Sequence, residues 1–241
     1  GHPMSERHPI IAITGSSGAG TTSVTRTFEN IFRRDGVKAA IIEGDSFHRY
    51  DRKEMKLRMA EAEKNGDQNF SHFGPENNLF AELEQLFHAY AESGTGKHRR
   101  YLHNAEEALP YKQEPGTFTP WQSLPEDTDL LFYEGLHGAV ITPEVNIARH
   151  PDLLIGVVPV INVEWIQKLW RDKKQRGYST EAVTGTILRR LPAYVHSICP
   201  RFTHTHVNFQ RVPMVDTSNP IITRDIPSAD ERLVVIRFAN P

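Results

Sequence analysis

The stretch from Ile10 to Thr22 reads IIAITGSSGAGTT, and this part of the sequence decides the fold. An apolar run at Ile10–Thr14 leads into a glycine-rich segment, and apolar residues then recur at helical spacing over Val24–Phe32. This order predicts a strand, a glycine turn and a helix. Backbone N–H groups of such a turn can wrap an anion, and the helix N-terminus favours negative charge. The stretch therefore predicts a phosphate-binding loop.

The segment Gly15–Thr22 matches the phosphate-loop template G-x-x-x-x-G-K-[ST] except at Thr21, which replaces the lysine. Thr22 keeps the hydroxyl that binds Mg²⁺. Because the lysine is missing, another cation must neutralise the β- and γ-phosphates of a nucleotide. An ordinary strand-to-helix turn of small residues is the alternative. The predicted nucleotide-binding residues are Gly15, Ser16, Ser17, Gly18, Ala19, Gly20, Thr21 and Thr22.

The composition is that of an ordinary globular protein. The 241 residues carry a formal net charge of -2, so we expect no bulk attraction to nucleic acid or to an anionic membrane. Cys199 is the single cysteine, which excludes an internal disulfide framework and favours the cytoplasm. No apolar run is long enough for a membrane span, and no signal peptide is visible. The segment 1–3, ahead of Met4, is typical of an expression-tag remnant.

Apolar runs alternate with helical patterns along the rest of the chain. The segment from Gly94 to Gln122 breaks this pattern, and there we expect only a small hairpin around Arg99–His103. The alternation predicts one α/β domain over residues 1–241, with a doubly wound, mostly parallel sheet and helices on both faces. Such sheets bind ligands at the carboxyl ends of their strands. The predicted strands are 38–44, 130–135, 153–160, 207–215 and 233–238, and the predicted helices are 53–64, 79–91, 162–175 and 180–198.

Two carboxylates directly follow predicted strands. Asp45 comes after the strand 38–44, where a carboxylate can take the proton of an acceptor hydroxyl in the transition state. A turn or helix-cap role is the alternative for Asp45. Glu134 ends the apolar run Leu130–Tyr133, a position from which a carboxylate holds Mg²⁺ in phosphoryl-transfer enzymes, unless it is a simple loop acid.

A cationic helix is predicted around the sequence KLWRDKKQRG at 168–177. Lys168, Asp172 and Arg176 recur at helical spacing and share one face, with Arg171 alongside. We expect a lid whose arginines close over the transferring phosphate and replace the missing loop lysine. A solvated charged face is the alternative.

A second basic cluster, KHRRYLH at 97–103, is less specific. It could hold a substrate phosphate, and cations beside an aromatic residue also suit nucleic acid. The slightly negative net charge disfavours nucleic acid, and we predict no such partner. The histidines show no zinc-type spacing.

Together these segments resemble the bacterial type of phosphoribulokinase, within the phosphoribulokinase/uridine kinase group of P-loop kinases. The lysine-free loop is itself a feature of that group. The resemblance covers nearly the whole chain. It is carried by the segments Gly15–Thr22, Glu43–Arg49, Phe132–Gly138, Glu164–Lys168, Arg171–Asp172, Arg176–Gly177 and Asn208–Pro213.

The resemblance implies a P-loop kinase fold with a lid helix, and phosphorylation of the C1 hydroxyl of ribulose 5-phosphate by ATP with Mg²⁺. It implies that Asp45 is the catalytic base, that Asp172 is a second acid needed for turnover, and that Arg171 is a γ-phosphate partner. Glu134 and Thr22 are implied as Mg²⁺ ligands. The implied contacts of the sugar phosphate are Lys168, which we also count as catalytic, and His48, Arg52, Tyr101, His103 and Arg176.

Bacterial members of the group are oligomers activated by NADH and inhibited by AMP, so the resemblance implies a homo-oligomer with these effectors. Arg34, Arg190 and Arg237 fall at positions tied to regulation or subunit contact. The family continues well past the strand 233–238, whereas this chain stops at Pro241.

Two alternatives are a uridine-kinase-like nucleoside kinase and a catalytically weak nucleotide-binding protein. Arg49 and Arg52, close to Asp45 in the sequence, favour an acceptor that already carries a phosphate.

Overall fold

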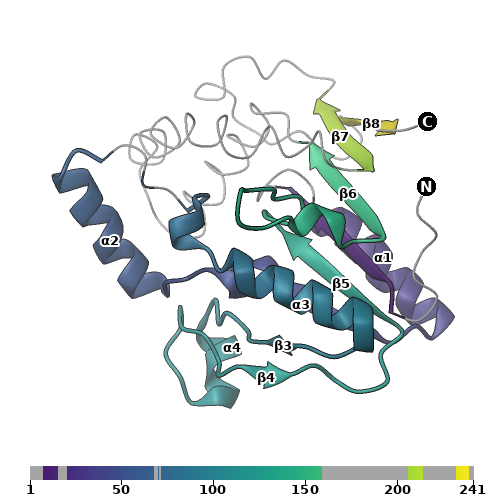
Figure 1. Cartoon of the computed structure of the whole chain (residues 1–241), viewed down its shortest axis with the longest axis horizontal. Helices are drawn as coiled ribbons and strands as arrows, with labels where there is room; N and C mark the ends of the chain where they lie inside the picture. Colours follow the sequence, from purple (N-terminus) through teal and green to yellow (C-terminus); the bar gives the residue numbers. More distant parts are fainter. Residues whose placement is uncertain are drawn as a thin grey trace.

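The computed structural model describes residues 8–15, 21–67, 70, 72–158, 206–213 and 232–238. Within these ranges, a six-stranded sheet has the order β2-β5-β1-β6-β7-β8 (Figure 1). All neighbouring strands are parallel except β8, which runs antiparallel to β7. The mostly parallel α/β sheet is confirmed. Its strands are β1 (Ile10–Thr14), β2 (Ala39–Glu43), β5 (Leu130–Gly135), β6 (Leu153–Val158), β7 (Val207–Pro213) and β8 (Arg232–Phe238).

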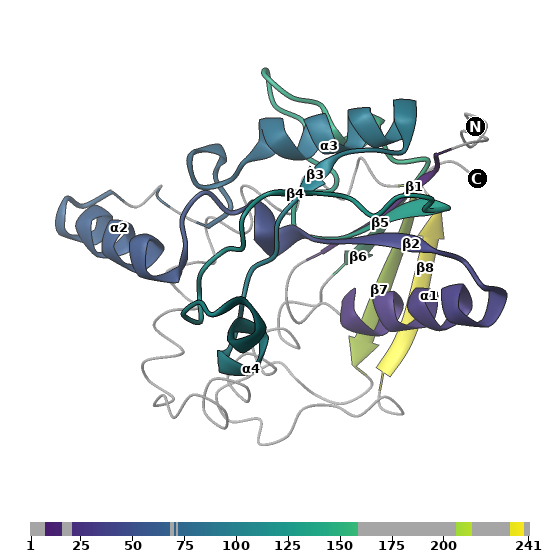
Figure 2. The same cartoon turned by 90° about the horizontal axis from the view of Figure 1, so that it is seen from below.

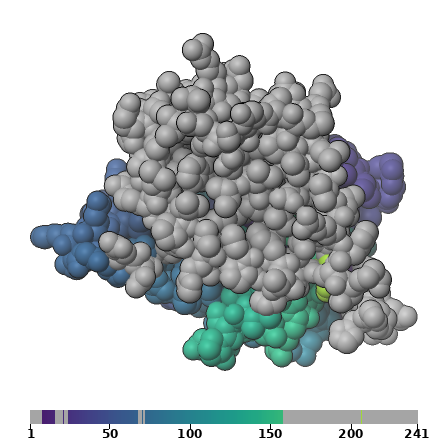
Figure 3. Space-filling model, turned by 90° about the horizontal axis from the view of Figure 1, so that it is seen from above, coloured from purple at the N-terminus to yellow at the C-terminus, as the bar shows by residue number. Residues whose placement is uncertain are grey.

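Helices cover both faces of this sheet, with α1 (Thr21–Asp35) on one face and α3 (Phe80–Ser93) on the other (Figure 2). The helix α2 (Arg52–Lys64) lies away from the sheet, and α1 and α2 stand at opposite ends of the molecule in Figure 3. Along the described ranges, no helix is both long enough and apolar enough to cross a membrane. The predicted helices 162–175 and 180–198, and with them the lid, lie outside the described residues.

Two apolar layers form because neighbouring side chains of a strand point to opposite faces of the sheet. In β1, Ile10 and Ala12 pack in the layer that contains the apolar face of α3. Ile11 and Ile13 pack in the layer that contains Phe32 of α1. Because β1 is buried on both faces, its sequence is a continuous apolar run rather than an alternating one.

The segment between α3 and β5 differs from the prediction. The expected hairpin around Arg99–His103 is wrong, because β3 (Lys97–His98) pairs instead with the distant β4 (Gln122–Ser123). The chain between these strands holds the short helix α4 (Ala105–Ala108) and a 3₁₀ turn at Leu109–Tyr111. A local sequence signal could not find this ribbon, since its two arms have only two residues each and are far apart in the chain.

The carboxyl ends of β2 and β5 approach unusually closely. A Cβ atom on Gly44 would lie 2.8 Å from the Gly135 Cα and 2.6 Å from the buried Tyr133 hydroxyl. The neighbouring residues Glu43 and Glu134 are register partners on these strands. The Gly15 N–H, at the end of β1, donates to the Gly135 carbonyl at 3.1 Å. The glycines therefore bring the ends of three strands together at one edge of the sheet.

Candidate active site

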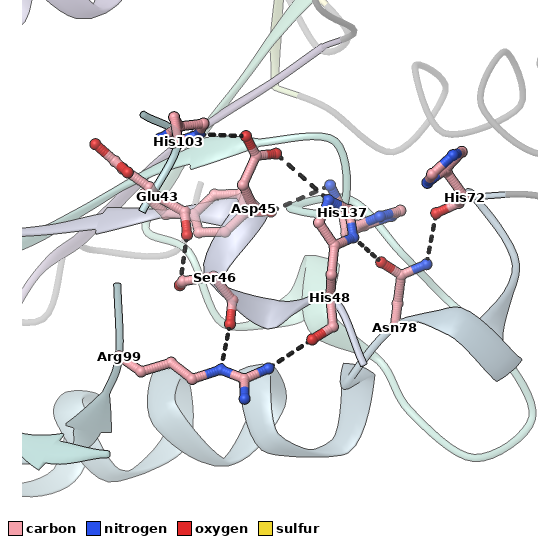
Figure 4. A network of polar contacts seen from close by, with 10 residues as sticks. Glu43, Asp45, Ser46, His48, His72, Asn78, Arg99, His103 and His137 are labelled. Atoms are coloured by element: carbon pink, nitrogen blue, oxygen red, sulfur yellow. Dashed lines mark hydrogen bonds and ion pairs between the residues drawn. The ribbon is translucent and has the colours of Figure 1, made fainter. Parts of the chain in front are cut away.

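Asp45 lies in a 3₁₀ turn, Gly44–Phe47, that directly continues β2. The buried Ser46 hydroxyl closes the turn by donating to the Glu43 carbonyl at 2.7 Å. The Asp45 carboxylate is half-exposed, and each of its oxygens faces an imidazole (Figure 4). His48 Nε2 lies 3.5 Å from Oδ1, and His103 Nε2 lies 3.2 Å from Oδ2. The predicted base is thus held between two histidines.

His103 is itself held between two carboxylates. The Glu107 Oε2 atom accepts the His103 backbone N–H at 2.8 Å and lies 3.0 Å from its Nδ1. The hydrogen bond to Asp45, together with Glu107, outweighs burial and raises the pKa of His103 to about 9. Burial pushes the pKa of Asp45 upward, but the hydrogen bonds from His103 and His48 outweigh it and hold that pKa well below its ordinary value. At neutral pH the pair is therefore an imidazolium beside a carboxylate.

His48 is oriented from its other ring nitrogen. Its Nδ1 lies 3.0 Å from the Asn78 Oδ1 atom. The amide nitrogen of Asn78 donates to the carbonyls of His72 and Gly74, both at 2.8 Å. Because this arrangement leaves only the amide oxygen for the ring, Nδ1 is the donor and Nε2 points to Asp45. Figure 4 shows this chain of contacts beside the turn.

Two more predicted substrate contacts lie beside His103. Arg52, the first residue of α2, donates from Nη2 to the His103 carbonyl at 2.7 Å. Its guanidinium carbon lies 5.8 Å from the centre of the Tyr101 ring, and that ring meets the His103 ring edge-on at 4.8 Å. The structure therefore brings His48, Arg52, Tyr101 and His103 together around Asp45. Arg49 does not join this group, because its Nε donates to the Glu76 carbonyl at 3.0 Å.

Carboxylates gather at the ends of β2 and β5. Glu134 is partly buried, accepts a hydrogen bond from the Thr21 side chain, and has its pKa raised by burial and by the charges of Asp45 and Glu43. The pKa of Glu43 is also raised, first by desolvation. Glu43 is not among the site residues that the sequence predicts. Its position opposite Glu134 depends on the strand order, which the sequence pattern does not give.

Residues at this edge of the sheet could supply only some of the ligands of a magnesium ion. Among the described residues, no three His, Cys, Asp or Glu side chains are placed to hold a metal by themselves. Mg²⁺ commonly takes one or two carboxylates and completes its shell with water and substrate phosphates. Glu134, with the nearby Thr21, fits that kind of site, because its partly buried carboxylate lies near the like charges of Asp45 and Glu43, which a cation would offset.

Several predicted site residues lie outside the described residues. They are the loop residues Ser16, Ser17, Gly18, Ala19 and Gly20 and the lid residues Lys168, Arg171, Asp172 and Arg176. The Thr22 side chain also lies outside the description, whereas Thr21 is buried at the start of α1. Gly15 lies close to both Thr21 and β6, since a Cβ there would be 2.8 Å from the Val157 carbonyl oxygen. Both described ends of the loop thus pack against the sheet edge that carries Glu134.

The comparison with protein families agrees with this geometry. The model of the Phosphoribulokinase / Uridine kinase family matches residues 10–218. The chain belongs to this family. The resemblance drawn from the sequence, the kinase fold and the phosphotransferase class are thereby confirmed.

Several members of the family are similar to this chain over nearly its whole length. "Phosphoribulokinase, chromosomal" of Cupriavidus necator is 77% identical over 99% of this chain and 82% of its own length. "Phosphoribulokinase" of Nitrobacter vulgaris is 66% identical over the same shares of the two chains. A solved structure, the phosphoribulokinase from Rhodobacter spheroides, is 56% identical and superposes with a TM-score of 0.87, covering 98% of this chain and 81% of that chain.

Proposed function

We propose that this chain is an ATP-dependent kinase that phosphorylates the C1 hydroxyl of ribulose 5-phosphate, giving ribulose 1,5-bisphosphate and ADP. Family membership and relatives at 66–77% identity support the reaction class and the acceptor. The structural observation that carries the proposal is the Asp45 carboxylate, fixed between His48 and His103 at the carboxyl edge of the sheet.

Asp45 is the proposed general base. Its lowered pKa keeps the carboxylate ionised at neutral pH, so it is ready to accept a proton. In the step, the acceptor oxygen forms a bond to the γ-phosphorus of ATP. The bond from that phosphorus to the β–γ bridging oxygen breaks, ADP leaves, and the hydroxyl proton passes to Asp45. A weak base suffices for a loose transition state, because the hydroxyl proton is lost late.

The phosphate of the acceptor is proposed to bind at His48, Arg52, Tyr101 and His103. Arg52 supplies a permanent positive charge, and the pKa of about 9 keeps His103 protonated at neutral pH. Tyr101 flanks both groups. The positive charges of Arg52 and His103 beside Asp45 suit an acceptor that already carries a phosphate better than they suit an uncharged nucleoside.

Mg²⁺ is proposed to bind with ATP near Glu134 and Thr22, where it would neutralise charge on the β- and γ-phosphates. Thr21 occupies the position of the phosphate-loop lysine and is buried. Because threonine is neutral, this position supplies no positive charge. The lid arginines Arg171 and Arg176 are proposed to supply it, with Lys168 as a contact of the sugar phosphate and Asp172 as the second acid. The roles of these four residues stay predictions.

The homo-oligomer and the NADH and AMP effectors also stay predictions. Of the three implied regulatory arginines, Arg34 is the one whose side chain is described. It lies exposed in the last turn of α1 and contacts Asp35 through two hydrogen bonds of 2.8 and 3.0 Å.

The test of the proposed function is an acceptor comparison. ADP release is followed with ATP and Mg²⁺ and with ribulose 5-phosphate, ribose 5-phosphate or uridine, and the product is identified by ³¹P NMR. The proposal expects turnover with ribulose 5-phosphate and a new phosphomonoester at C1. Faster turnover with uridine would replace it by the nucleoside-kinase alternative. ATP binding without turnover on any acceptor would favour the catalytically weak nucleotide-binding alternative.

A further inference from the structure

Arg99, in the basic cluster 97–103, is partly buried and reaches the turn that carries Asp45. Its guanidinium carbon lies 3.7 Å from the centre of the Phe118 ring and 4.7 Å from that of Trp121. Its Nε donates to the Ser46 carbonyl at 2.8 Å, and its Nη2 donates to the His48 carbonyl at 2.5 Å. In Figure 4, Arg99 reaches the turn from the side opposite His103.

These two hydrogen bonds pair backbone carbonyls in and next to the turn that carries Asp45. The Asp45 carbonyl accepts from the His48 N–H at 3.3 Å, and the Phe47 carbonyl accepts from the Leu79 N–H at 2.8 Å. Arg99 supplies a donor for each of two further carbonyls, those of Ser46 and His48. A buried carbonyl without a donor is unfavourable, so these two hydrogen bonds stabilise the conformation of the turn.

The surroundings of Arg99 fix the guanidinium as well. Burial lowers the pKa of Arg99 to about 10, and the group is still charged at neutral pH. Phe118 and Trp121 both come from the segment that returns from α4 to β4. The Trp121 ring also meets the ring of Phe47, in the turn, edge-on, with 5.6 Å between the ring centres. Arg99 thereby ties the β3–β4 ribbon to the turn through hydrogen bonds and ring contacts together.

We propose that Arg99 is a positioning residue, which holds the backbone at Ser46 and His48 so that the Asp45 carboxylate between them faces the acceptor hydroxyl. It acts through these two residues, because the Nε and Nη2 edge of its guanidinium is engaged with their carbonyls. The inference rests on the proposed function in taking Asp45 as the base. It gives Arg99 a role other than the contact with a substrate phosphate that the sequence left open for the basic cluster.

The test compares Arg99→Ala and Arg99→Lys with the wild type. Displacement of a catalytic group by about 1 Å costs about 10²-fold, so Arg99→Ala is expected to lose about that factor in kcat. Arg99→Lys keeps the positive charge but cannot donate through two fixed N–H groups, so a smaller loss of kcat is expected. The KM for ribulose 5-phosphate is expected to stay within a small factor, since the guanidinium does not touch the acceptor. Millimolar guanidinium ion is expected to restore part of kcat in Arg99→Ala and none in Arg99→Lys.

Arg58 provides a matched control. Its guanidinium carbon also lies over an aromatic ring, that of Tyr50, at 4.0 Å, but its Nε bonds Glu54 on the same helix at 3.0 Å. Arg58→Ala is expected to leave kcat unchanged. A large KM increase with unchanged kcat in Arg99→Ala would overturn the positioning role and restore the phosphate contact. A folded Arg99→Ala with wild-type kcat and KM would also overturn the role.

A second readout needs no turnover and separates this proposal from the proposed function. The His103 titration is followed by NMR in the ligand-free protein, because His103 reports where the Asp45 carboxylate lies. The titratable and charged groups around His103 are Asp45, Glu107, Glu43 and Tyr101, with Arg52 at its carbonyl. Arg99→Lys is expected to lower the His103 titration midpoint, and an unchanged midpoint would contradict the proposal even if the wild type turns over no acceptor. Absent turnover by the wild type would instead contradict the proposed function alone.

Discussion

His103 Nε2 lies 3.2 Å from Asp45 Oδ2, although 58 positions separate the two residues in the chain. Asp45 reaches this place from the end of β2, and His103 from the segment between β3 and α4. Glu107 holds the opposite side of the His103 ring. The ion pair thus joins the sheet edge to the outer ribbon, and each partner changes the protonation of the other.

The first prediction concerns the titration of His103. In the folded protein, His103 is expected to titrate with a pKa of about 9, above its ordinary value of 6.5. Because the folded pKa is the higher one, the pair stabilises the fold fully below about pH 6.5 and loses this contribution as the pH rises through about 9. Histidine NMR titration and urea unfolding at several pH values measure the two effects.

Asp45→Asn is expected to lower the His103 pKa, because the largest favourable contact is lost. The exposed Asp127 has a left-handed backbone, with φ of 57°, that asparagine tolerates, so Asp127→Asn is the control and should leave the His103 titration unchanged. A His103 pKa that does not respond to Asp45→Asn would refute the ion pair.

The second prediction concerns the close approach of the two strand ends. Gly135→Ala is expected to destabilise the protein by about 1–3 kcal/mol, as overpacking of a dense region does. The new Cβ would lie 2.7 Å from the Gly44 Cα. Chemical denaturation measures the change. Gly36→Asn is the control, since Gly36 has φ of 67° with open space around it, and the loss there should be smaller. Equal losses at both positions would contradict the crowding.

The third prediction concerns magnesium. Glu134→Gln keeps an acceptor for Thr21 but removes the charge, and the Mg²⁺ concentration for half-maximal turnover is expected to rise at least about 10-fold. Calorimetric titration of Mg²⁺ with ATP present measures the same change without turnover. The exposed Glu126→Gln should leave both values at wild type. An unaltered Mg²⁺ requirement in Glu134→Gln would remove Glu134 from the metal site.

Much of the fold could be predicted from the sequence because its central strands are buried on both faces. A continuous apolar run such as Ile10–Ile13 leaves little choice of structure, and Asp45 and Glu134 follow such runs directly. The carboxyl ends of parallel strands meet at one edge of the sheet, which is why the two acids could be placed near each other before the strand order was known.

The parts that could not be predicted depend on contacts between distant residues. The inward turn of Arg99 requires Phe118 and Trp121, which the β3–β4 pairing brings back to it. Its neighbours in the sequence are basic as well, so the pattern alone could not distinguish a partly buried arginine that binds backbone carbonyls from a phosphate ligand. The place of Glu43 opposite Glu134 similarly follows from strand order and not from periodicity.

Asp45 is proposed to take the proton of the acceptor hydroxyl, and kcat of Asp45→Asn with ATP, Mg²⁺ and ribulose 5-phosphate tests this role. Asparagine has nearly the same shape and accepts no proton, so kcat is expected to fall at least ~10²-fold, while ATP affinity measured by calorimetry stays near wild type. Asp127→Asn, assayed in parallel, should retain wild-type kcat. A kcat within a few-fold of wild type in Asp45→Asn would contradict the account.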